Sequence, residues 1–170
     1  MEVNVQVQRR AEGNKRTMFL GSRQRERNTK YWPETRWAAV IDSLHDAMPE
    51  AAVLLMGVPM ERALNRAILR HVRSPAAIDV AGEVPVTRLM GLASLASGMV
   101  SVDTGPAHIA GTLGCPVVVL FGAHNPLVFM PTGDDARAEF VAGDRSTSRP
   151  MLTITVKDVM DAWQRLRSGT

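Results

Sequence analysis

Short apolar segments alternate with amphipathic segments along this chain, and the alternation limits the folds that it can adopt. The apolar segments are Thr17–Gly21, Ala52–Met56, Ala77–Val80, Met99–Val102, Pro116–Phe121 and Ala138–Val141. Apolar residues recur at helical spacing in Pro33–Met48, Met60–Ile68, Val86–Ala96, Pro106–Leu113 and Thr155–Leu166. Strand and helix in alternation predict an α/β fold, a Rossmann-like, mainly parallel sheet with helices on both faces.

The length of 170 residues suits one domain, and 45% hydrophobic with 22% charged residues is ordinary for a globular protein. We assign residues 17–170 to this domain and residues 1–16 to a flexible basic arm. No apolar run approaches the roughly 20 residues that span a bilayer, and the N-terminus lacks a signal-peptide core. We therefore expect a cytoplasmic protein.

Cys115, the single cysteine, is expected to be a buried small apolar residue.

Positive charge is concentrated near the N-terminus. Residues 1–37 contain nine Lys or Arg against four acids (+5), whereas residues 38–170 contain eleven against thirteen (−2). This segment is either a solvated basic loop or a surface for an anionic partner, such as lipid or a phosphorylated small molecule. Nucleic acid is not expected as a partner, because few aromatic residues lie nearby to stack on bases.

The junction Asp103-Thr104-Gly105-Pro106 joins a predicted strand to a predicted helix. Helix N-termini leave unpaired N–H groups with partial positive charge, so this turn predicts a phosphate or diphosphate site. Gly105 would let the backbone approach an anion closely, and Pro106 suits the first helical turn. Asp103 either caps the helix or accepts hydrogen bonds from sugar hydroxyls. His108 is either packed or solvated, or it reaches a phosphate or sugar.

The same Asp-Thr-Gly sequence also occurs in aspartic proteases. Those enzymes need two such aspartates that share a proton in an all-β fold. This chain has one Asp-Thr-Gly, at Asp103, and it leads into a helix. The residues therefore disfavour a protease.

Three blocks resemble the C-terminal half of the glycosyltransferase family 9 enzymes, the ADP-heptose:lipopolysaccharide heptosyltransferases. They are KYWPETRWAAVIDSL (Lys30–Leu44), LLMGVPMER (Leu54–Arg62) and VSVDTGPAHIAGTLGCPVVVLFGAHNP (Val100–Pro126), in the family's order and near its spacing. The resemblance implies a GT-B architecture, in which two Rossmann-like domains enclose a cleft and the C-terminal domain binds the nucleotide-sugar donor. The donor is then a substrate, and no cofactor is expected.

The resemblance also implies roles for individual residues. Positions matching Asp103, Thr104, Gly105, Pro106 and His108 lie at the donor's diphosphate and sugar, and the one matching Lys30 faces the same group. A cation there would offset charge on the leaving diphosphate, so Lys30 and Asp103 are the candidate catalytic residues. Glu61 is expected at the ribose and Val84 near the adenine, with Ser22 and Arg25 as further phosphate contacts. If Lys30 and Glu61 have no such role, they are plain surface charges. One acid near the diphosphate is too little to predict a metal site.

The chain departs from the family pattern at Ala123, His124 and Asn125, where the family more often has Pro, Thr and Asp, and this leaves donor specificity open. A complete family member is about twice as long, and its N-terminal half supplies the acceptor site and the base. The expected partners are therefore a nucleotide-sugar donor, an N-terminal acceptor domain or separate chain, and a lipid-linked saccharide at the inner membrane surface. Two functions stay open: the donor half of a glycosyltransferase, or a nucleotide-binding or interaction module without catalysis.

Overall fold

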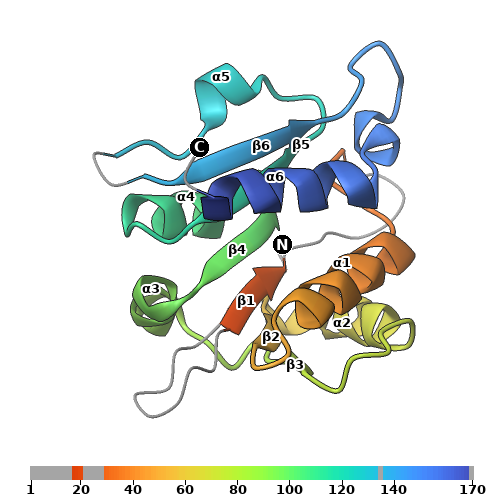
Figure 1. The fold of residues 1–170 in the computed structure, drawn as a ribbon. Helices are drawn as coiled ribbons and strands as arrows, with labels where there is room; N and C mark the ends of the chain where they lie inside the picture. The colour runs from red at the N-terminus through yellow and green to blue at the C-terminus, as the bar shows by residue number, and fades with distance from the viewer. Residues whose placement is uncertain (1–16, 21–28, 134–135, 169–170) are drawn as a thin grey trace.

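The computed structural model describes residues 17–20, 29–133 and 136–168, and its central element is one parallel sheet (Figure 1). The strands are β1 (Thr17–Leu20), β2 (Ala52–Leu55), β3 (Ala77–Asp79), β4 (Gly98–Val102), β5 (Val117–Phe121) and β6 (Ala138–Ala142). They lie in the order β3-β2-β1-β4-β5-β6, and each neighbouring pair is parallel. The predicted α/β fold with a parallel sheet is confirmed.

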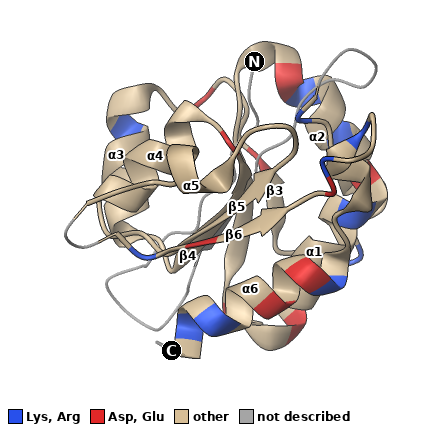
Figure 2. Cartoon of the chain, turned by 90° about the horizontal axis from the view of Figure 1, so that it is seen from above, with Lys and Arg blue, Asp and Glu red and all other residues tan. Residues whose placement is uncertain are grey.

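Helices cover both faces of the sheet. They are α1 (Glu34–Ala47), α2 (Arg62–Leu69), α3 (Val86–Leu95), α4 (Gly105–Thr112), α5 (Pro126–Phe129) and α6 (Val156–Ser168). On one face α1 contacts α2 and α6, and on the other α3 contacts α4. Figure 2 shows that Lys, Arg, Asp and Glu gather on the first face, whereas α4 and α5 carry none. The helices on the first face therefore carry many more charged side chains than those on the second.

The core is formed by the central strands and the helices against them. Every residue of β4 and β5 is buried, as expected for strands covered on both sides. Trp32 and Trp37 are both fully buried and pack edge to face, with ring centroids 4.8 Å apart. The Trp32 indole N–H donates to the Ile154 carbonyl, and Arg36 donates to the same carbonyl at 2.6 Å. These contacts attach the start of α1 to the segment before α6.

Local signals in the sequence explain where several helices begin and end. Gly114 follows α4 with a φ of +75°, a left-handed conformation that favours glycine. Thr155 and Asp158 form the predicted capping box: the Asp158 carboxylate accepts from the Thr155 N–H at 2.9 Å, and the Thr155 hydroxyl accepts from the Asp158 N–H at 3.1 Å. Both predicted helix boundaries are confirmed.

Three short elements differ from the prediction. The helix expected over Met60–Ile68 is divided into a 3-10 helix, Pro59–Glu61, and α2. The four-residue helix α5 and the 3-10 helix Pro150–Thr153 were not predicted. Helices of three or four residues show no apolar periodicity, because they hold at most about one turn.

Cys115 lies between α4 and β5 and is only 2% exposed, as the sequence predicted. Burial raises the pKa of its thiol to about 12. Among the helices that the structure describes, none has the length and apolar character needed to cross a membrane.

Candidate functional site

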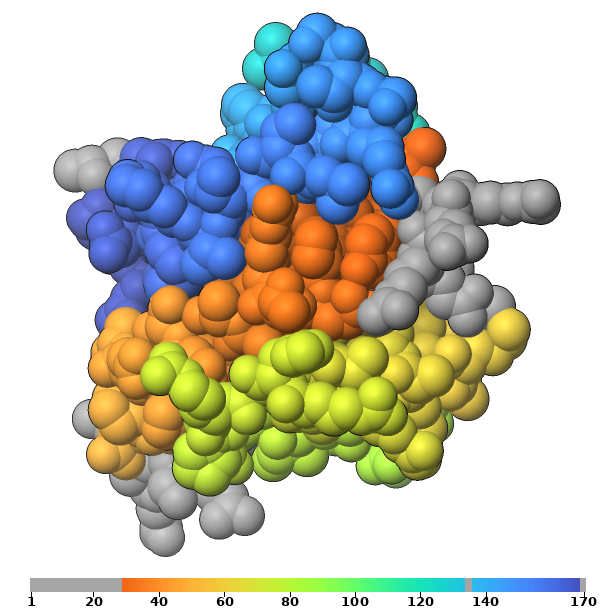
Figure 3. All heavy atoms as spheres, turned by 90° about the vertical axis from the view of Figure 1, so that its right-hand side faces the viewer, coloured from red at the N-terminus to blue at the C-terminus, as the bar shows by residue number. Residues whose placement is uncertain are grey.

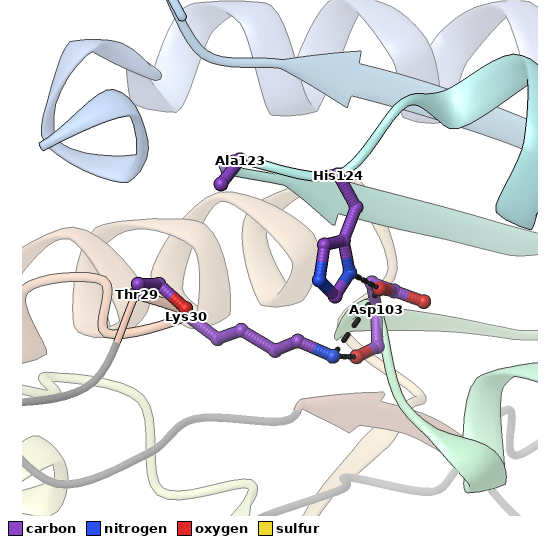
Figure 4. A pocket seen from close by; sticks show the side chains of 6 residues that line it. Thr29, Lys30, Asp103, Ala123 and His124 are labelled. Atoms are coloured by element: carbon purple, nitrogen blue, oxygen red, sulfur yellow. Dashed lines mark hydrogen bonds and ion pairs between the residues drawn. The ribbon is translucent and has the colours of Figure 1, made fainter.

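The order of the strands marks one place along the sheet as a binding position. From β1 the chain continues through β2 to β3 in one direction, and from β4 it continues through β5 to β6 in the other. In open parallel sheets of this kind, ligands bind beyond the carboxyl ends of the strands where this reversal occurs. A small pocket lies at that edge, lined by Thr29, Lys30, Asp103, Gly122, Ala123 and His124 (Figure 4).

Lys30 and Asp103 meet in this pocket although 73 residues separate them in the sequence. The Lys30 Nζ lies 3.2 Å from the Asp103 Oδ2 and also donates to the Asp103 backbone carbonyl. The Lys30 side chain is 19% exposed and that of Asp103 is 8% exposed. The alternative of a plain surface lysine is therefore wrong for Lys30, which is held against the first residue after β4.

Two histidines contact the same carboxylate. The His124 Nδ1 lies 2.6 Å from the Asp103 Oδ2, and the His108 Nε2 lies 3.4 Å from the Asp103 Oδ1. His124 follows β5, and His108 is in the first turn of α4. The ring of His124 also packs on that of Phe129, with centroids 5.1 Å apart. Thus Lys30, His108 and His124 come from three segments and converge on Asp103.

These contacts hold Asp103 in its ionised form. Burial alone would raise the pKa of its carboxyl, but hydrogen bonds from His124 and Lys30, the positive charge of Lys30 and the contact with His108 together lower it. The net pKa lies below the ordinary aspartate value of 3.8. Asp103 is therefore an anion at neutral pH, with side-chain partners on both oxygens.

The first turn of α4 lies beside this cluster. Its N-cap is Thr104, whose side chain does not cap the helix, and the Ala107 N–H donates to the Thr104 carbonyl at 3.1 Å. The interpretation of Asp103 as a helix cap is wrong, because its carboxylate faces Lys30 and the histidines instead. A Cβ added to Gly105 would meet no heavy atom within 4 Å in the described part of the chain. Pro106 occupies the first turn, as predicted.

Glu61 ends the 3-10 helix that follows β2, and Val84 lies in the loop after β3, at the same edge of the sheet. Glu61 is 1% exposed, so it is not a surface charge, and its Oε2 accepts from the Val58 N–H at 2.9 Å. Val84 is half-buried. The Gly82 N–H donates to the Gly57 carbonyl at 2.6 Å, which brings the two loops together. No contact between either residue and the Lys30–Asp103 pair is described. Ser22 and Arg25 lie outside the described residues.

From the sequence, His124 is a departure from the family pattern and not a predicted site residue. Its place after a fully buried strand was the available signal, since the loop after β5 opens at the same edge as the loop after β4. In the residues described, no group of three or more His, Cys, Asp or Glu side chains is arranged to hold a metal ion.

The parallel sheet, with its strand order reversing between β1 and β4, defines a doubly wound α/β domain. The sequence model of glycosyltransferase family 9 (heptosyltransferase) matches residues 3–152. The chain belongs to this family.

Relatives of known function extend this result. The chain is 33% identical over 116 residues to lipopolysaccharide heptosyltransferase 3 of Escherichia coli, covering 68% of this chain and 34% of that protein. It is 35% identical over 130 residues to lipopolysaccharide heptosyltransferase 1 of Pseudomonas aeruginosa, covering 75% and 34%. The chain thus spans about a third of the length of these two relatives.

Solved structures show the same fold. A family 9 glycosyl transferase from Veillonella parvula has a TM-score of 0.80 at 18% identity, over 92% of this chain and 47% of that one. ADP-heptose lipopolysaccharide heptosyltransferase II of E. coli has a TM-score of 0.74 at 19% identity, over 95% and 49%. E. coli heptosyltransferase WaaC, solved with ADP, has a TM-score of 0.72 at 18% identity, over 92% and 46%. The chain corresponds to about half of each of these structures.

Proposed function

We propose that this chain is the donor-binding half of a heptosyltransferase and that it binds an ADP-sugar at the carboxyl edge of the sheet. The observation that carries the proposal is the Lys30 ammonium held by Asp103 at the first turn of α4. A fixed cation at the start of a helix, where the helix dipole also favours negative charge, is suited to a diphosphate. The related enzyme WaaC was solved with ADP, which supports an adenosine diphosphate as the nucleotide part of the proposed donor.

The rest of the donor would extend along the same edge. The loops that carry Glu61 and Val84 follow β2 and β3, on the far side of β1 from Asp103. The family resemblance supports a ribose contact for Glu61 and an adenine contact for Val84. Glu61 is 1% exposed, so its carboxylate would have to open toward the ligand. In Figure 3 the orange segment from residue 29 onward lies between the blue C-terminal segment and the yellow-green segment that follows β2.

The reaction proposed for the intact enzyme needs a second half. The bond between the sugar's anomeric carbon and the diphosphate oxygen breaks while the acceptor oxygen bonds to that carbon. A base from the N-terminal acceptor domain or a separate chain takes the hydroxyl proton, and Lys30 offsets the charge that gathers on the departing diphosphate. The acceptor is a lipid-linked saccharide at a membrane surface, as the lipopolysaccharide enzymes among the relatives suggest.

Calorimetric titration of the full chain with ADP, ADP-heptose and UDP-sugars tests the donor site. We expect Lys30→Ala to weaken ADP-sugar binding about 30-fold and Asp103→Ala about tenfold, since each removes part of a charged contact. Lys157→Ala is the matched control, because that lysine is 82% exposed on α6, and its affinity should equal that of the unmodified chain. If the unmodified chain binds no nucleotide, the donor-half proposal is wrong.

A second measurement separates the enzyme from a module without catalysis. Sugar transfer is assayed with the chain alone and with the N-terminal half of a family 9 relative added. Transfer that depends on both parts and on Lys30 supports the enzyme, whereas nucleotide binding without transfer in either mixture supports the module.

A further inference from the structure

His124 is placed to contact the same anion that Lys30 is proposed to bind. It lines the pocket with Lys30 and Asp103, and its side chain is 46% exposed. The family resemblance gives it no role, because threonine is the commoner residue at this position. A function for His124 would therefore distinguish this chain from its relatives.

The contact with Asp103 fixes how the His124 ring is used. A carboxylate only accepts hydrogen bonds, so the Nδ1 of His124 carries the hydrogen that it donates to Asp103 Oδ2 at 2.6 Å. Figure 4 shows the second ring nitrogen on the side of the ring away from Asp103. Within the described part of the chain, Nε2 makes no hydrogen bond. Packing on Phe129 supports the ring from α5.

We propose that His124 donates a hydrogen bond to the donor's diphosphate only when its ring is protonated, an inference that rests on the proposed function. When the ring is protonated, Nε2–H donates to a phosphoryl oxygen while Nδ1–H stays on Asp103. Deprotonation removes the hydrogen from Nε2, which then presents a lone pair to the anion. Donor affinity consequently falls as the pH rises through the range in which histidine loses its charge, about pH 5 to 8.

The other ionisable groups that face His124 do not reproduce this behaviour. Asp103 stays ionised throughout this range, because its pKa lies below 3.8. The ordinary pKa of a lysine side chain lies far above pH 8. His108 contacts the other Asp103 oxygen from α4 and is also a histidine, so it needs its own variant.

The test measures ADP-glucose binding to the full chain by calorimetry at pH 6 and pH 8. ADP-glucose is chosen because its diphosphate has no ionisation in this range, whereas the terminal phosphate of ADP titrates near pH 6. We expect the unmodified chain to bind about tenfold more tightly at pH 6 than at pH 8. His124→Gln should remove most of this difference, and His108→Gln should leave most of it.

His71→Gln is the matched control, because His71 is exposed and follows α2 at the opposite edge of the sheet. Thermal unfolding of each variant checks that the fold is retained. If His124→Gln keeps the full pH dependence while Lys30→Ala still weakens binding, the role of His124 is wrong and the donor site stands. If the unmodified chain binds ADP-glucose equally well at pH 6 and pH 8, the role of His124 is wrong. If it binds neither ADP-glucose nor ADP-heptose at either pH, both proposals fail.

Discussion

Two buried carboxylates at opposite edges of the sheet have different kinds of partners. Asp42 is 7% exposed on α1, and its carboxylate accepts from the backbone N–H groups of Arg73 and Ser74, both at 3.0 Å, and from the Arg73 guanidinium at 2.9 Å. Asp103 is 5% exposed, and its carboxylate contacts the side chains of Lys30, His124 and His108. Backbone partners tie Asp42 to the loop before β3. The partners of Asp103 are side chains, which can change rotamer and contact a ligand.

The comparison shows that a lowered pKa alone does not identify a site. For Asp42, burial would raise the pKa, but the Arg73 side chain and the N–H groups of Ser74 and Arg73 lower it below 3.8. The pKa of Asp103 is lowered in the same direction. What distinguishes Asp103 is its position at the carboxyl edge, where the strand order reverses, and its half-exposed partners.

The largest expected difference between the Asp42 and Asp103 regions is in the free energy of unfolding. Asp42→Ala should lower the free energy of unfolding by about 3 kcal/mol, because it leaves two backbone N–H groups without their acceptor. ADP-sugar affinity should not change. Urea denaturation and calorimetry measure the two quantities. Arg73→Ala is the control and should have a much smaller effect on stability, since that side chain is 81% exposed. A loss of donor binding in Asp42→Ala would remove the distinction drawn between the two carboxylates.

A smaller effect is expected in acid. Both carboxyls have a pKa below 3.8 in the folded chain, so each stabilises the fold above about pH 4, and this stabilisation is lost as the pH falls through the lowered values. Asp42→Asn and Asp103→Asn should each lose less stability than the unmodified chain between pH 7 and pH 3. Urea denaturation at the two pH values gives the difference. An equal acid loss in all three chains would show that neither carboxyl contributes.

The smallest effect sharpens the description of the anion site. Gly105→Ala should raise the free energy of unfolding by about 0.5–1 kcal/mol, because alanine restricts the unfolded chain and its Cβ has space here. It should also weaken ADP-sugar binding, since the methyl group occupies the space through which the diphosphate approaches.

Gly91→Ala is its matched control. Gly91 lies on α3, and an added Cβ there also meets nothing within 4 Å among the described residues. This variant should gain similar stability and keep its affinity. Unchanged binding in Gly105→Ala would move the diphosphate away from the first turn of α4.

The fold could be predicted from the sequence because its signals are local. The unbroken run of Val117–Phe121 predicts a strand buried on both faces, and the apolar positions from Trp37 to Leu44 predict the inner face of α1. The short helix α5 has too few residues to show a period. Its start depends on Asn125, whose side chain accepts from the Leu127 N–H.

The site was less accessible to sequence reasoning, because its contacts are not local. Nothing near Lys30 indicates a partner 73 residues away, and only the resemblance placed Lys30 and Asp103 together. Capping was one of two alternatives for Asp103 and relied on local preference, and the carboxylate instead pairs with Lys30. The place of His124 after a buried strand pointed to the edge of the sheet but not to its partner, because the contact with Asp103 requires β4 and β5 to be neighbours in the sheet.

The burial of the single cysteine makes this chain convenient for labelling. The thiolate is the form that reacts with maleimides, and a thiol with a pKa of about 12 and 2% exposure supplies very little of it. Leu127 on α5 is 84% exposed. In a Leu127→Cys variant, a fluorescent maleimide would therefore react almost entirely at position 127 and hardly at Cys115. Such a probe would report directly when another protein domain or a membrane covers that corner of the molecule.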